Sequence, residues 1–444
     1  MNGGLSMVEM KSGYKMTEVG VIPEDWEVKN VSESCLIKAR IGWQGLKKSE
    51  YMSSGDYLLI TGTDFDNGQV NWKSCAYVSK ARYEQDSNIK IRPQDILISK
   101  DGTIGKVAYL GMIPKAGTLN SGIFVIRANE RKIDQVFLSK IFMSFYFEDF
   151  LNRLVAGSTI NHLYQKDFVK FCFPLPNSEE QAAIATALSD VDSLISALTK
   201  KIEKKKAIKQ GLMQQLLTGK KRLPGYEKNR EPVQTEWGAI PKDWKTLSIG
   251  KCCSIKARIG WQGLKKSEYL SSGEYVLVTG TDFLNGRIDW KSCVYVSKKR
   301  YEQDANIQIV KHDILITKDG TIGKVAFLDD VPCLGTLNSG IFVVRSHSEE
   351  LDQCYLSKIF ESFIFDAFLE SLVAGSTINH LYQKDFVHFN FPVPPTMSEQ
   401  TAIANILSDC DSEIAALEEK RDKYKEIKQG MMQQLLTGKI RLIK

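Results

Sequence analysis

Four short polar segments carry the side chains best suited to chemistry, and each of them occurs twice in the chain. Residues 38–51 (KARIGWQGLKKSEY) interleave cations with glycine and tryptophan, and they recur unchanged at residues 256–269. Segments beginning at Thr61, Lys100 and Gly157 add hydroxyl, amide and imidazole groups and recur in the same order. Cations and backbone N–H groups at glycine-rich turns contact phosphates, whereas Asn, Gln, Arg and Lys hydrogen-bond to base edges. Together the segments predict a DNA-binding surface, although each alone fits an ordinary turn equally well.

The candidate DNA-binding residues are the polar members of these segments and an Asn–Ser pair in the repeated run GTLNSGIFV. In the first copy they are Lys38, Arg40, Trp43, Gln44, Lys47, Lys48, Thr61, Thr63, Lys100, Asp101, Thr103, Lys106, Asn120, Ser121, Ser158, Thr159, Asn161 and His162. In the second copy they are Lys256, Arg258, Trp261, Gln262, Lys265, Lys266, Thr279, Thr281, Lys318, Asp319, Thr321, Lys324, Asn338, Ser339, Ser376, Thr377, Asn379 and His380.

Signatures of catalysis are missing from the sequence. No GxxxxGK[ST] phosphate loop occurs, and the GTIGK run ending at Lys106 has a different spacing. Methyltransferase tetrapeptides of the NPPY or DPPY type are also missing. Asp95 and Lys100 resemble a PD-(D/E)xK nuclease motif only faintly, because their spacing is wrong. We therefore expect no catalytic residue and no cofactor site in this chain.

The repeated histidines, His162 and His380, are the remaining candidates for a metal site. Neither has a cysteine or carboxylate nearby at the spacing of metal ligands. We expect them to hydrogen-bond to DNA or within the fold, and we predict no metal.

Composition and charge fit a multidomain protein that binds nucleic acid. The 444 residues are 43% hydrophobic, with a net charge of +6 and a pI near 8.6. The nine cysteines include no CxxC pair, and most lack a counterpart in the other copy, which indicates free thiols in a reducing compartment. Residues 1–15 lack a signal peptide's apolar run, and no run approaches the roughly 20 apolar residues of a membrane span. We expect a cytoplasmic protein that does not enter a membrane.

Each globular segment is predicted to be richer in strand than in helix. Apolar and β-branched runs bounded by Gly, Asn and Asp predict strands over residues 57–65, 95–100, 106–110 and 122–128. Turn signals lie at residues 66–68 and 101–102. Aromatic and aliphatic residues at helical spacing predict one helix over residues 136–154.

Two long helices are the clearest structural prediction. The expected capping boxes are Ser178 with Gln181 and Thr396 with Glu399, and the expected stops are Gly219 and Gly438. The first apolar stripe consists of Ile184, Leu188, Val191, Ile195, Leu198 and Ile202, and after Lys205 and Lys209 it continues with Leu212 and Leu216. Such alternating spacing of three and four residues is typical of a coiled-coil seam, so we expect the two helices to pack antiparallel.

The predicted fold class is α+β. Two similar mixed α/β domains, at residues 13–176 and 241–395, alternate with two long helices, at residues 177–220 and 396–438, and residues 221–240 form a linker. We expect the helices to form an antiparallel coiled coil that separates the domains in a pseudo-two-fold arrangement.

This order of motifs resembles the specificity (S) subunit of type I restriction-modification systems. The resemblance rests on IPxDW at Ile22 and Ile240, the KDGTIGK run, GST followed by HL, a proline-rich exit, SEEQ at the helix entry, and MQQLLTGK closing each helix. It covers essentially the whole chain, twice.

The resemblance implies a non-catalytic protein with two target recognition domains separated by spacer helices. Its partners would be double-stranded DNA, two methyltransferase (M) subunits and, in a full system, two restriction (R) subunits. S-adenosylmethionine, ATP and Mg would be used by those partners, and this chain would bind none of them. Recognition domains in the family usually differ from each other, whereas these are nearly identical.

Two like domains related by a two-fold axis read the same half-site on opposite strands. We therefore predict a bipartite palindromic target with an unread spacer. The copies differ beside one predicted turn, at Asp66/Leu284, Gln69/Arg287 and Asn71/Asp289. Three alternatives stay open from sequence: a stand-alone DNA endonuclease, a scaffold that does not bind DNA, and a specificity subunit of a methyltransferase-only system.

Overall fold

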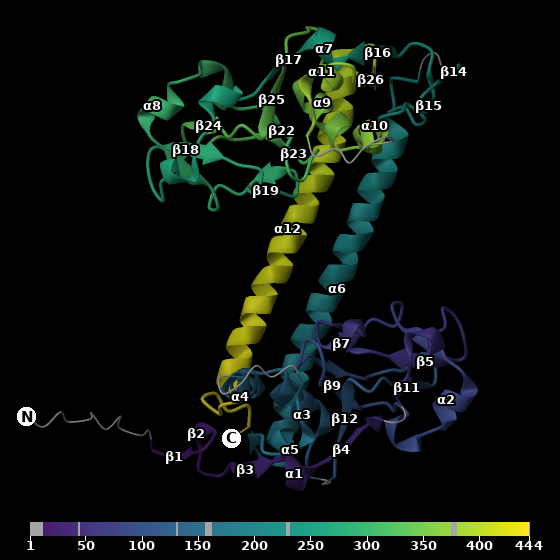
Figure 1. Cartoon of the computed structure of the whole chain (residues 1–444), viewed down its shortest axis with the longest axis vertical. Helices are drawn as coiled ribbons and strands as arrows, with labels where there is room; N and C mark the ends of the chain where they lie inside the picture. The colour runs from purple at the N-terminus through teal and green to yellow at the C-terminus, as the bar shows by residue number, and fades with distance from the viewer. Residues whose placement is uncertain are drawn as a thin grey trace, which may run out of the picture. The chain divides into compact units, whose positions relative to one another are not determined.

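The computed structural model describes residues 12–42, 45–129, 132–155, 162–227, 231–373 and 380–443 (Figure 1). It divides into two compact units. Unit 1 contains residues 1–198 and 420–444, and unit 2 contains residues 199–419. Each unit therefore joins one of the repeated globular domains to parts of both long helices.

The globular domain of unit 1 alternates short strands with short helices. Its strands are β1 (Tyr14–Thr17), β2 (Gly20–Pro23), β3 (Glu27–Asn30), β4 (Cys35–Ala39), β5 (Tyr57–Ile60), β6 (Phe65–Asp66), β7 (Gln69–Val70), β8 (Ala76–Val78), β9 (Ile96–Ser99), β10 (Val107–Tyr109), β11 (Gly117–Leu119), β12 (Ile123–Ala128) and β13 (Cys172–Leu175). Its helices are α1 (Val31–Ser34), α2 (Lys80–Glu84), α3 (Gln135–Phe142), α4 (Phe145–Val155) and α5 (Gln165–Phe168).

Two sheets bring the ends of four strands to one edge of unit 1. The first has the order β10-β9-β12-β4 and the second β11-β5-β8. Because β12 is antiparallel to both β9 and β4, those two strands run in the same direction, and β11 and β5 are parallel neighbours. The N–H of Asn120 donates to the Ile60 carbonyl at 2.9 Å, and the N–H of Lys100 donates to the Gly122 carbonyl at 2.8 Å. The loops that follow β4, β5, β9 and β11 therefore meet.

The four-stranded sheet is buried on both faces, which explains its continuous apolar sequence. Alternate residues of a strand point to opposite faces. Ile96 and Ile98 accordingly join the core cluster that includes α3, whereas Leu97 joins a second cluster with residues of β5 and β11. Burial on both faces holds β9 and its following loop in a fixed position.

The single helix predicted over residues 136–154 is wrong, because the structure has two helices with a break at Met143 and Ser144. The Ser144 hydroxyl donates to the Ile141 carbonyl at 2.7 Å and accepts from the N–H of Tyr146 at 3.3 Å. A serine that bonds to nearby backbone in this way competes with the helical hydrogen-bond pattern.

Unit 2 repeats this architecture with the corresponding sheet orders β17-β25-β22-β23 and β21-β18-β24. Its strands are β14 (Pro232–Thr235), β15 (Gly238–Pro241), β16 (Lys245–Ser248), β17 (Cys253–Lys256), β18 (Tyr275–Val278), β19 (Phe283–Leu284), β20 (Arg287–Ile288), β21 (Val294–Val296), β22 (Ile314–Thr317), β23 (Val325–Phe327), β24 (Gly335–Leu337), β25 (Ile341–Ser346) and β26 (Asn390–Val393). Its helices are α7 (Ile249–Cys252), α8 (Lys298–Tyr301), α9 (Gln353–Phe360), α10 (Phe363–Val373) and α11 (Gln383–Phe386).

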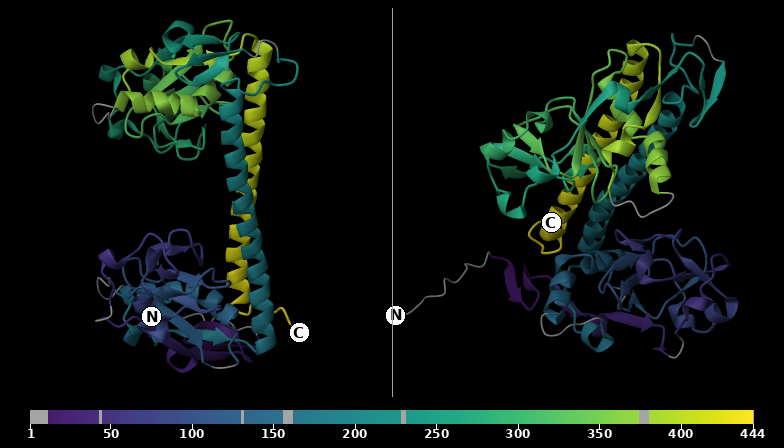
Figure 2. Two further views of the ribbon diagram at one scale, coloured as in Figure 1. Left: turned by 90° about the vertical axis from the view of Figure 1, so that its right-hand side faces the viewer. Right: turned by 45° about the horizontal axis from the view of Figure 1, so that its top comes forward.

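The long helices α6 (Ser178–Leu216) and α12 (Met397–Leu435) lie side by side within each unit (Figure 2). In unit 2, Lys206 pairs with Glu418 at 2.7 Å and Lys209 pairs with Asp411 at 2.5 Å. A later residue of α6 thus meets an earlier residue of α12, which makes the pair antiparallel, as the seam predicts.

The first helix is capped one residue earlier than the sequence suggests. Asn177 Oδ1 accepts from the N–H of Glu180 at 2.9 Å, so Asn177 and not Ser178 is the N-cap. The Gln181 amide instead donates to the Pro176 and Lys132 carbonyls and so ties α6 to the globular domain. In the second helix the Thr396 hydroxyl accepts from the N–H of Glu399 at 3.3 Å, as expected.

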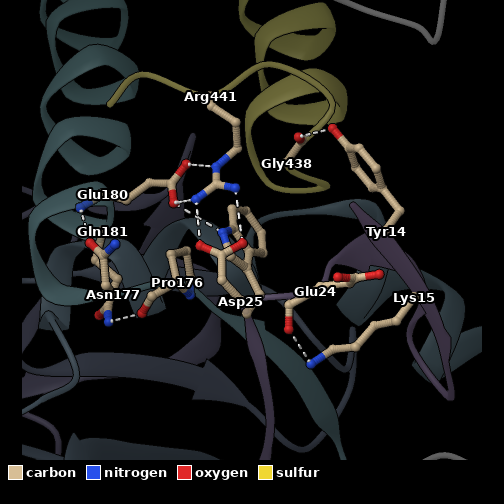
Figure 3. Close-up of polar contacts among 11 residues, drawn as sticks. Tyr14, Lys15, Glu24, Asp25, Pro176, Asn177, Glu180, Gln181, Gly438 and Arg441 are labelled. Atoms are coloured by element: carbon tan, nitrogen blue, oxygen red, sulfur yellow. Dashed lines mark hydrogen bonds and ion pairs between the residues drawn. The ribbon is translucent and has the colours of Figure 1, made fainter. Parts of the chain in front are cut away.

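The segment that follows α12 is attached to unit 1 through Arg441 (Figure 3). Its guanidinium lies 2.7 Å from the fully buried Glu180 carboxylate at the start of α6 and 2.8 Å from Asp25. Trp26 Nε1 donates to the same Glu180 carboxylate at 2.9 Å. In unit 2, Arg222 holds the equivalent pair in the same way. The segment that follows each long helix therefore forms ion pairs with residues of the other repeat.

Helix α6 also contains an 18-residue window with a mean hydropathy of 1.3, which by length and composition suffices for a membrane span. Length and composition alone are weak evidence for a span, because the core helix of a protein that does not enter a membrane passes the same test. In the structure, Ile184 and Leu188 of this helix lie in the core of unit 1, and Asp192 is paired with Lys140 and Lys428. A helix packed in this way is part of a protein core, so we conclude that α6 is not a membrane span.

Candidate nucleic-acid interface

The loops at the shared edge of β4, β5, β9 and β11 bring together the predicted segments, and we call this region the strand-end surface. It consists of residues 40–51, 61–64, 100–106, 120–122 and 162–166 as far as the structure describes them. These loops lie far apart in the sequence and meet because the strands before them are parallel in direction.

The base of the basic loop after β4 is fixed by Arg40, which is only 2% exposed. Its Nε donates to the Leu119 carbonyl at 2.8 Å, and its Nη2 donates to the Thr118 hydroxyl at 3.0 Å. Burial lowers the pKa of this guanidinium. In this structure Arg40 attaches the loop to β11 and does not face solvent, and its predicted contact with DNA stays a prediction.

Arg258 has the same structural role in unit 2. It is also 2% exposed and donates to the Leu337 carbonyl at 2.8 Å and the Thr336 hydroxyl at 3.0 Å. The Gln262 side chain is also buried, at 5% exposure, and its predicted contact with DNA stays a prediction.

The loop after β5 is a compact turn built on the buried Asp64. One Asp64 oxygen accepts from both the N–H and the hydroxyl of Thr61 at 2.8 Å, and the other accepts from Ser74 at 2.8 Å. Thr61 therefore has a structural task, while Thr63 remains exposed beside it. The same arrangement recurs in unit 2 around Asp282.

The loop after β9 is joined to the segment that ends at His162. The N–H of Leu163 donates to the Lys100 carbonyl at 2.7 Å, and His162 Nδ1 contacts the Asp101 carboxylate. Gly105 has φ +79° and lies against Leu151, so a larger residue would not fit there. His162 thus bonds within the fold, one of the two roles expected for it.

The connection between β11 and β12 completes the strand-end surface. The Asn120 amide donates to the hydroxyl of Tyr51, which ends the basic loop, and the Ser121 hydroxyl donates to Asn120 Oδ1 at 2.9 Å. Tyr51 was not among the predicted site residues. The signal in the sequence is that Tyr51 ends a segment that is unchanged between the two repeats. A tyrosine by itself does not indicate which residue its hydroxyl contacts.

The exposed polar side chains of this surface are predominantly cationic or neutral. In unit 1 the exposed members of the predicted set are Lys47, Lys48, Asp101, Thr63, Thr103 and Lys106, and the half-exposed members are Lys38, Thr61, Lys100, Asn120, Ser121 and His162. The acidic Glu50 is neutralised by Arg82 at 2.6 Å, and this contact lowers the pKa of Glu50 to about 2. The surface can therefore approach a polyanion.

In unit 2 the corresponding members of the predicted set are half-exposed or exposed. They are Lys256, Lys265, Lys266, Thr279, Thr281, Lys318, Asp319, Thr321, Lys324, Asn338, Ser339 and His380. Outside the described part of the chain lie Trp43, Gln44, Ser158, Thr159, Asn161, Ser376, Thr377 and Asn379, together with the side chain of Trp261.

Comparison with known proteins decides the family. The model of the type I restriction modification DNA specificity domain matches residues 23–210 and again residues 241–429. The chain belongs to this DNA specificity family. Each match begins in a globular domain and extends along the long helix that follows it.

Curated relatives of this specificity-family chain match it along nearly its full length. A putative type I restriction enzyme MjaX specificity subunit of Methanocaldococcus jannaschii is 28% identical over 97% of this chain and 97% of the relative. The type I restriction enzyme MjaVIII specificity subunit of the same organism is 27% identical over 95% of this chain and 94% of the relative.

Solved structures show the same fold at lower sequence identity. The crystal structure of a type I restriction-modification system S subunit from M. genitalium matches with a TM-score of 0.59 and 15% identity, covering 92% of this chain and 96% of that chain. A chain from a structural study of complex assembly and conformational transition of the type I R-M system matches with a TM-score of 0.50 and 18% identity, covering 94% of this chain and 99% of that chain.

The residue that most resembled a nuclease carboxylate has a structural role in this member of the family. Asp95 is 2% exposed, and both of its oxygens accept from Arg127, at 2.6 and 2.7 Å. Within the described residues, no group of His, Cys, Asp and Glu side chains is arranged to hold a metal ion.

Proposed function

We propose that each unit reads one half of a split double-stranded DNA target through its strand-end surface. The observation that carries this proposal is the meeting of five loops at one edge, with exposed Lys47, Lys48 and Lys106 around hydroxyl and amide groups. Lysines at such an edge contact phosphates, while neighbouring amides and hydroxyls reach base edges. Membership of the DNA specificity family supports the same function.

The two half-sites have the same sequence on opposite strands, so the target is a split palindrome. Every described residue of the strand-end surface is identical in the two repeats, whereas the repeats differ at the nearby β6–β7 hairpin. Each unit also combines its globular domain with the first part of its own long helix and the last part of the other. The two units therefore have the same composition with the repeats exchanged, which supports an equal reading of the two half-sites.

The chain supplies recognition, and other subunits supply catalysis. It works in the cytoplasm with two methyltransferase subunits, which use S-adenosylmethionine, and in a full system with two restriction subunits that use ATP and Mg. The structural role of Asp95 and the missing methyltransferase motifs support this division of labour. The pairing of α6 with α12 sets the length of the unread spacer.

Methylation mapping tests this proposal directly. The chain is co-expressed with the methyltransferase subunit encoded beside it in a host without DNA methylation, and N6-methyladenine is mapped across the genome. We expect one split palindromic motif, methylated once in each half on opposite strands. An asymmetric motif would contradict the equal reading of half-sites, and DNA cleavage by the purified chain with Mg²⁺ alone would contradict the non-catalytic role.

A variant pair locates the DNA-binding face in the same assay. Thr103→Ala with Thr321→Ala alters the strand-end surface in both units, while Asp190→Asn changes an exposed residue of α6 outside it. We expect the first variant to lose or relax the methylated motif and the second to leave the motif unchanged. The opposite result would place recognition elsewhere on the molecule.

A further inference from the structure

An apolar side chain stands exposed within the basic loop of each unit. Ile41 and Ile259 each have 54% of their surface exposed and are the most exposed isoleucines in the described part of the chain. Each directly follows the buried arginine that attaches the loop to the neighbouring strand. The position of each isoleucine is therefore fixed by the protein, although much of its side chain meets solvent.

Single exposed apolar residues are common, so exposure alone says little about function. Whether both repeats keep such a residue is more informative. At several exposed positions one repeat has an apolar residue and the other a polar one, whereas other exposed apolar residues, Ile208 and Ile427 among them, are kept in both repeats. Examples of the differing positions are Leu36/Ser254, Met112/Asp330, Val310/Arg92 and Leu284/Asp66. At the strand-end surface both repeats keep Ile41 and Ile259 unchanged. An apolar group retained among lysines indicates a partner that offers both anionic and apolar contacts.

Duplex DNA offers this combination in its major groove. Phosphates line the groove, and thymine presents a C5-methyl group at the base edge, which apolar side chains recognise. Lys47 and Lys48 belong to the same loop as Ile41, and Lys38 lies near the end of the strand before it, so phosphate contacts by these lysines would bring the isoleucine to the bases.

We propose that Ile41 and Ile259 each contact the C5-methyl group of a thymine, one in each half-site. This inference rests on the proposed function and adds a specificity-determining residue to it. The other way in which an isoleucine contacts DNA is as a wedge between base pairs. Only the thymine contact depends on the C5-methyl group, so removing that group distinguishes it from a wedge.

Replacing thymine by uracil removes only this methyl group and so tests the contact. Duplexes carry the mapped target, with the thymines of both half-sites replaced by uracil at one position at a time. The full chain, assembled with its methyltransferase subunits, is titrated with each duplex. We expect uracil at one position to weaken binding about fourfold for each half-site, the effect of losing one buried methyl group. The Ile41→Ala/Ile259→Ala variant should bind the thymine and uracil duplexes equally.

A matched control uses the other pair of equivalent exposed isoleucines. Ile208 and Ile427, on the long helices, are 43% and 41% exposed, and the Ile208→Ala/Ile427→Ala variant should remain as sensitive to uracil as the unaltered protein. If the unaltered protein binds its target but ignores uracil at every position, or if the target lacks thymine, the inference is wrong while the proposed function stands. If the unaltered complex shows no selective, salt-dependent DNA binding, the proposed function itself fails.

Discussion

Lys428 Nζ lies 2.6 Å from Asp192 Oδ1, and this ion pair joins the last turns of α12 to α6 in unit 1. Lys140, from α3 of the globular domain, contacts the other Asp192 oxygen at 2.7 Å. One carboxylate thus connects three elements that come from distant parts of the sequence. We call this group the unit 1 node.

Unit 2 contains the equivalent node with one more acid. Asp411 pairs with Lys209 at 2.5 Å and with Lys358 at 2.8 Å. Glu361 accepts from the same two lysines, at 2.9 and 3.2 Å. The unit 1 node has Met143 at the position of Glu361, so its two lysines share a single carboxylate.

We expect Asp192→Asn to destabilise unit 1 by about 2–4 kcal/mol. The Lys140 side chain is 8% exposed and would lose its anionic partner, and breaking a buried ion pair in this way is strongly destabilising. The figure lies below the range for fully buried pairs because the Asp192 side chain is 28% exposed. Calorimetry of the full chain should show a lowered transition for unit 1. Asp190→Asn, on the exposed side of the same helix, is the control and should leave both transitions in place.

The stability of the nodes should depend on pH in the acid range. Burial acts to raise the pKa of Asp192, but Lys140 and Lys428 outweigh it and hold the pKa below its ordinary value of 3.8. A carboxyl group with a lowered folded-state pKa stabilises the fold above its unfolded pKa, about 3.9, and this contribution is lost as the pH falls through the folded pKa. Unfolding free energies measured between pH 7 and pH 2 should therefore fall most steeply below about pH 4. For Asp192→Asn a slope as steep as that of the unaltered protein would contradict this origin.

Exchanging the residue types of Met143 and Glu361 should destabilise unit 2 and stabilise unit 1. Glu361→Met leaves Lys209 and Lys358 with Asp411 alone and should lower the transition of unit 2, by on the order of 1–2 kcal/mol. Met143→Glu should raise the transition of unit 1 by a smaller amount, because the new carboxylate must be desolvated. Both shifts should shrink in 1 M NaCl, which screens the more exposed ends of these pairs. Shifts of equal size at low and high salt would point to packing as the cause.

Exposed lysines and buried arginines of the basic loop should differ in their effects on DNA binding. Lys47→Ala with Lys265→Ala should reduce the slope of log affinity against log salt by about 0.9 for each lost phosphate contact and leave folding unchanged. Arg40→Met with Arg258→Met should lower thermal stability, because the Leu119 and Leu337 carbonyls lose their donors. Affinity measured between 50 and 300 mM NaCl, with thermal unfolding in parallel, separates the two effects.

The sequence is sufficient to predict elements whose periodicity is long or whose ends have special backbone geometry. The long helices follow from their apolar stripes, and their stops at Gly219 and Gly438 have φ +66° and +68°, a region that favours glycine. The turn at Asn67 and Gly68 likewise has positive φ at both residues. Local chemistry decides these features, so they can be predicted without knowing what packs against them.

Features that depend on distant partners could not be predicted in the same way. An arginine in a basic loop is typical of a DNA contact. The structural role of Arg40 depends on the Leu119 carbonyl, which the pairing of β11 with β5 brings close. The helix break at Ser144 depends on the hydrogen bond from the Ser144 hydroxyl to the Ile141 carbonyl. The N-cap at Asn177 instead of Ser178 is a shift of one residue between two good capping residues.

The fastening of Arg441 onto Glu180 and Asp25 has a consequence for synthesis on the ribosome. The first part of unit 1 precedes all of unit 2 in the sequence, yet the unit 1 core includes Leu435 and Leu436, which follow unit 2. Unit 2 lies entirely within residues 199–419 and so is complete while translation continues. Domains usually fold in the order of their synthesis. In this protein the domain that is translated first must therefore wait for residues that are translated after all of unit 2, and a stop codon that removes Leu435, Leu436 and Arg441 leaves its core unfinished.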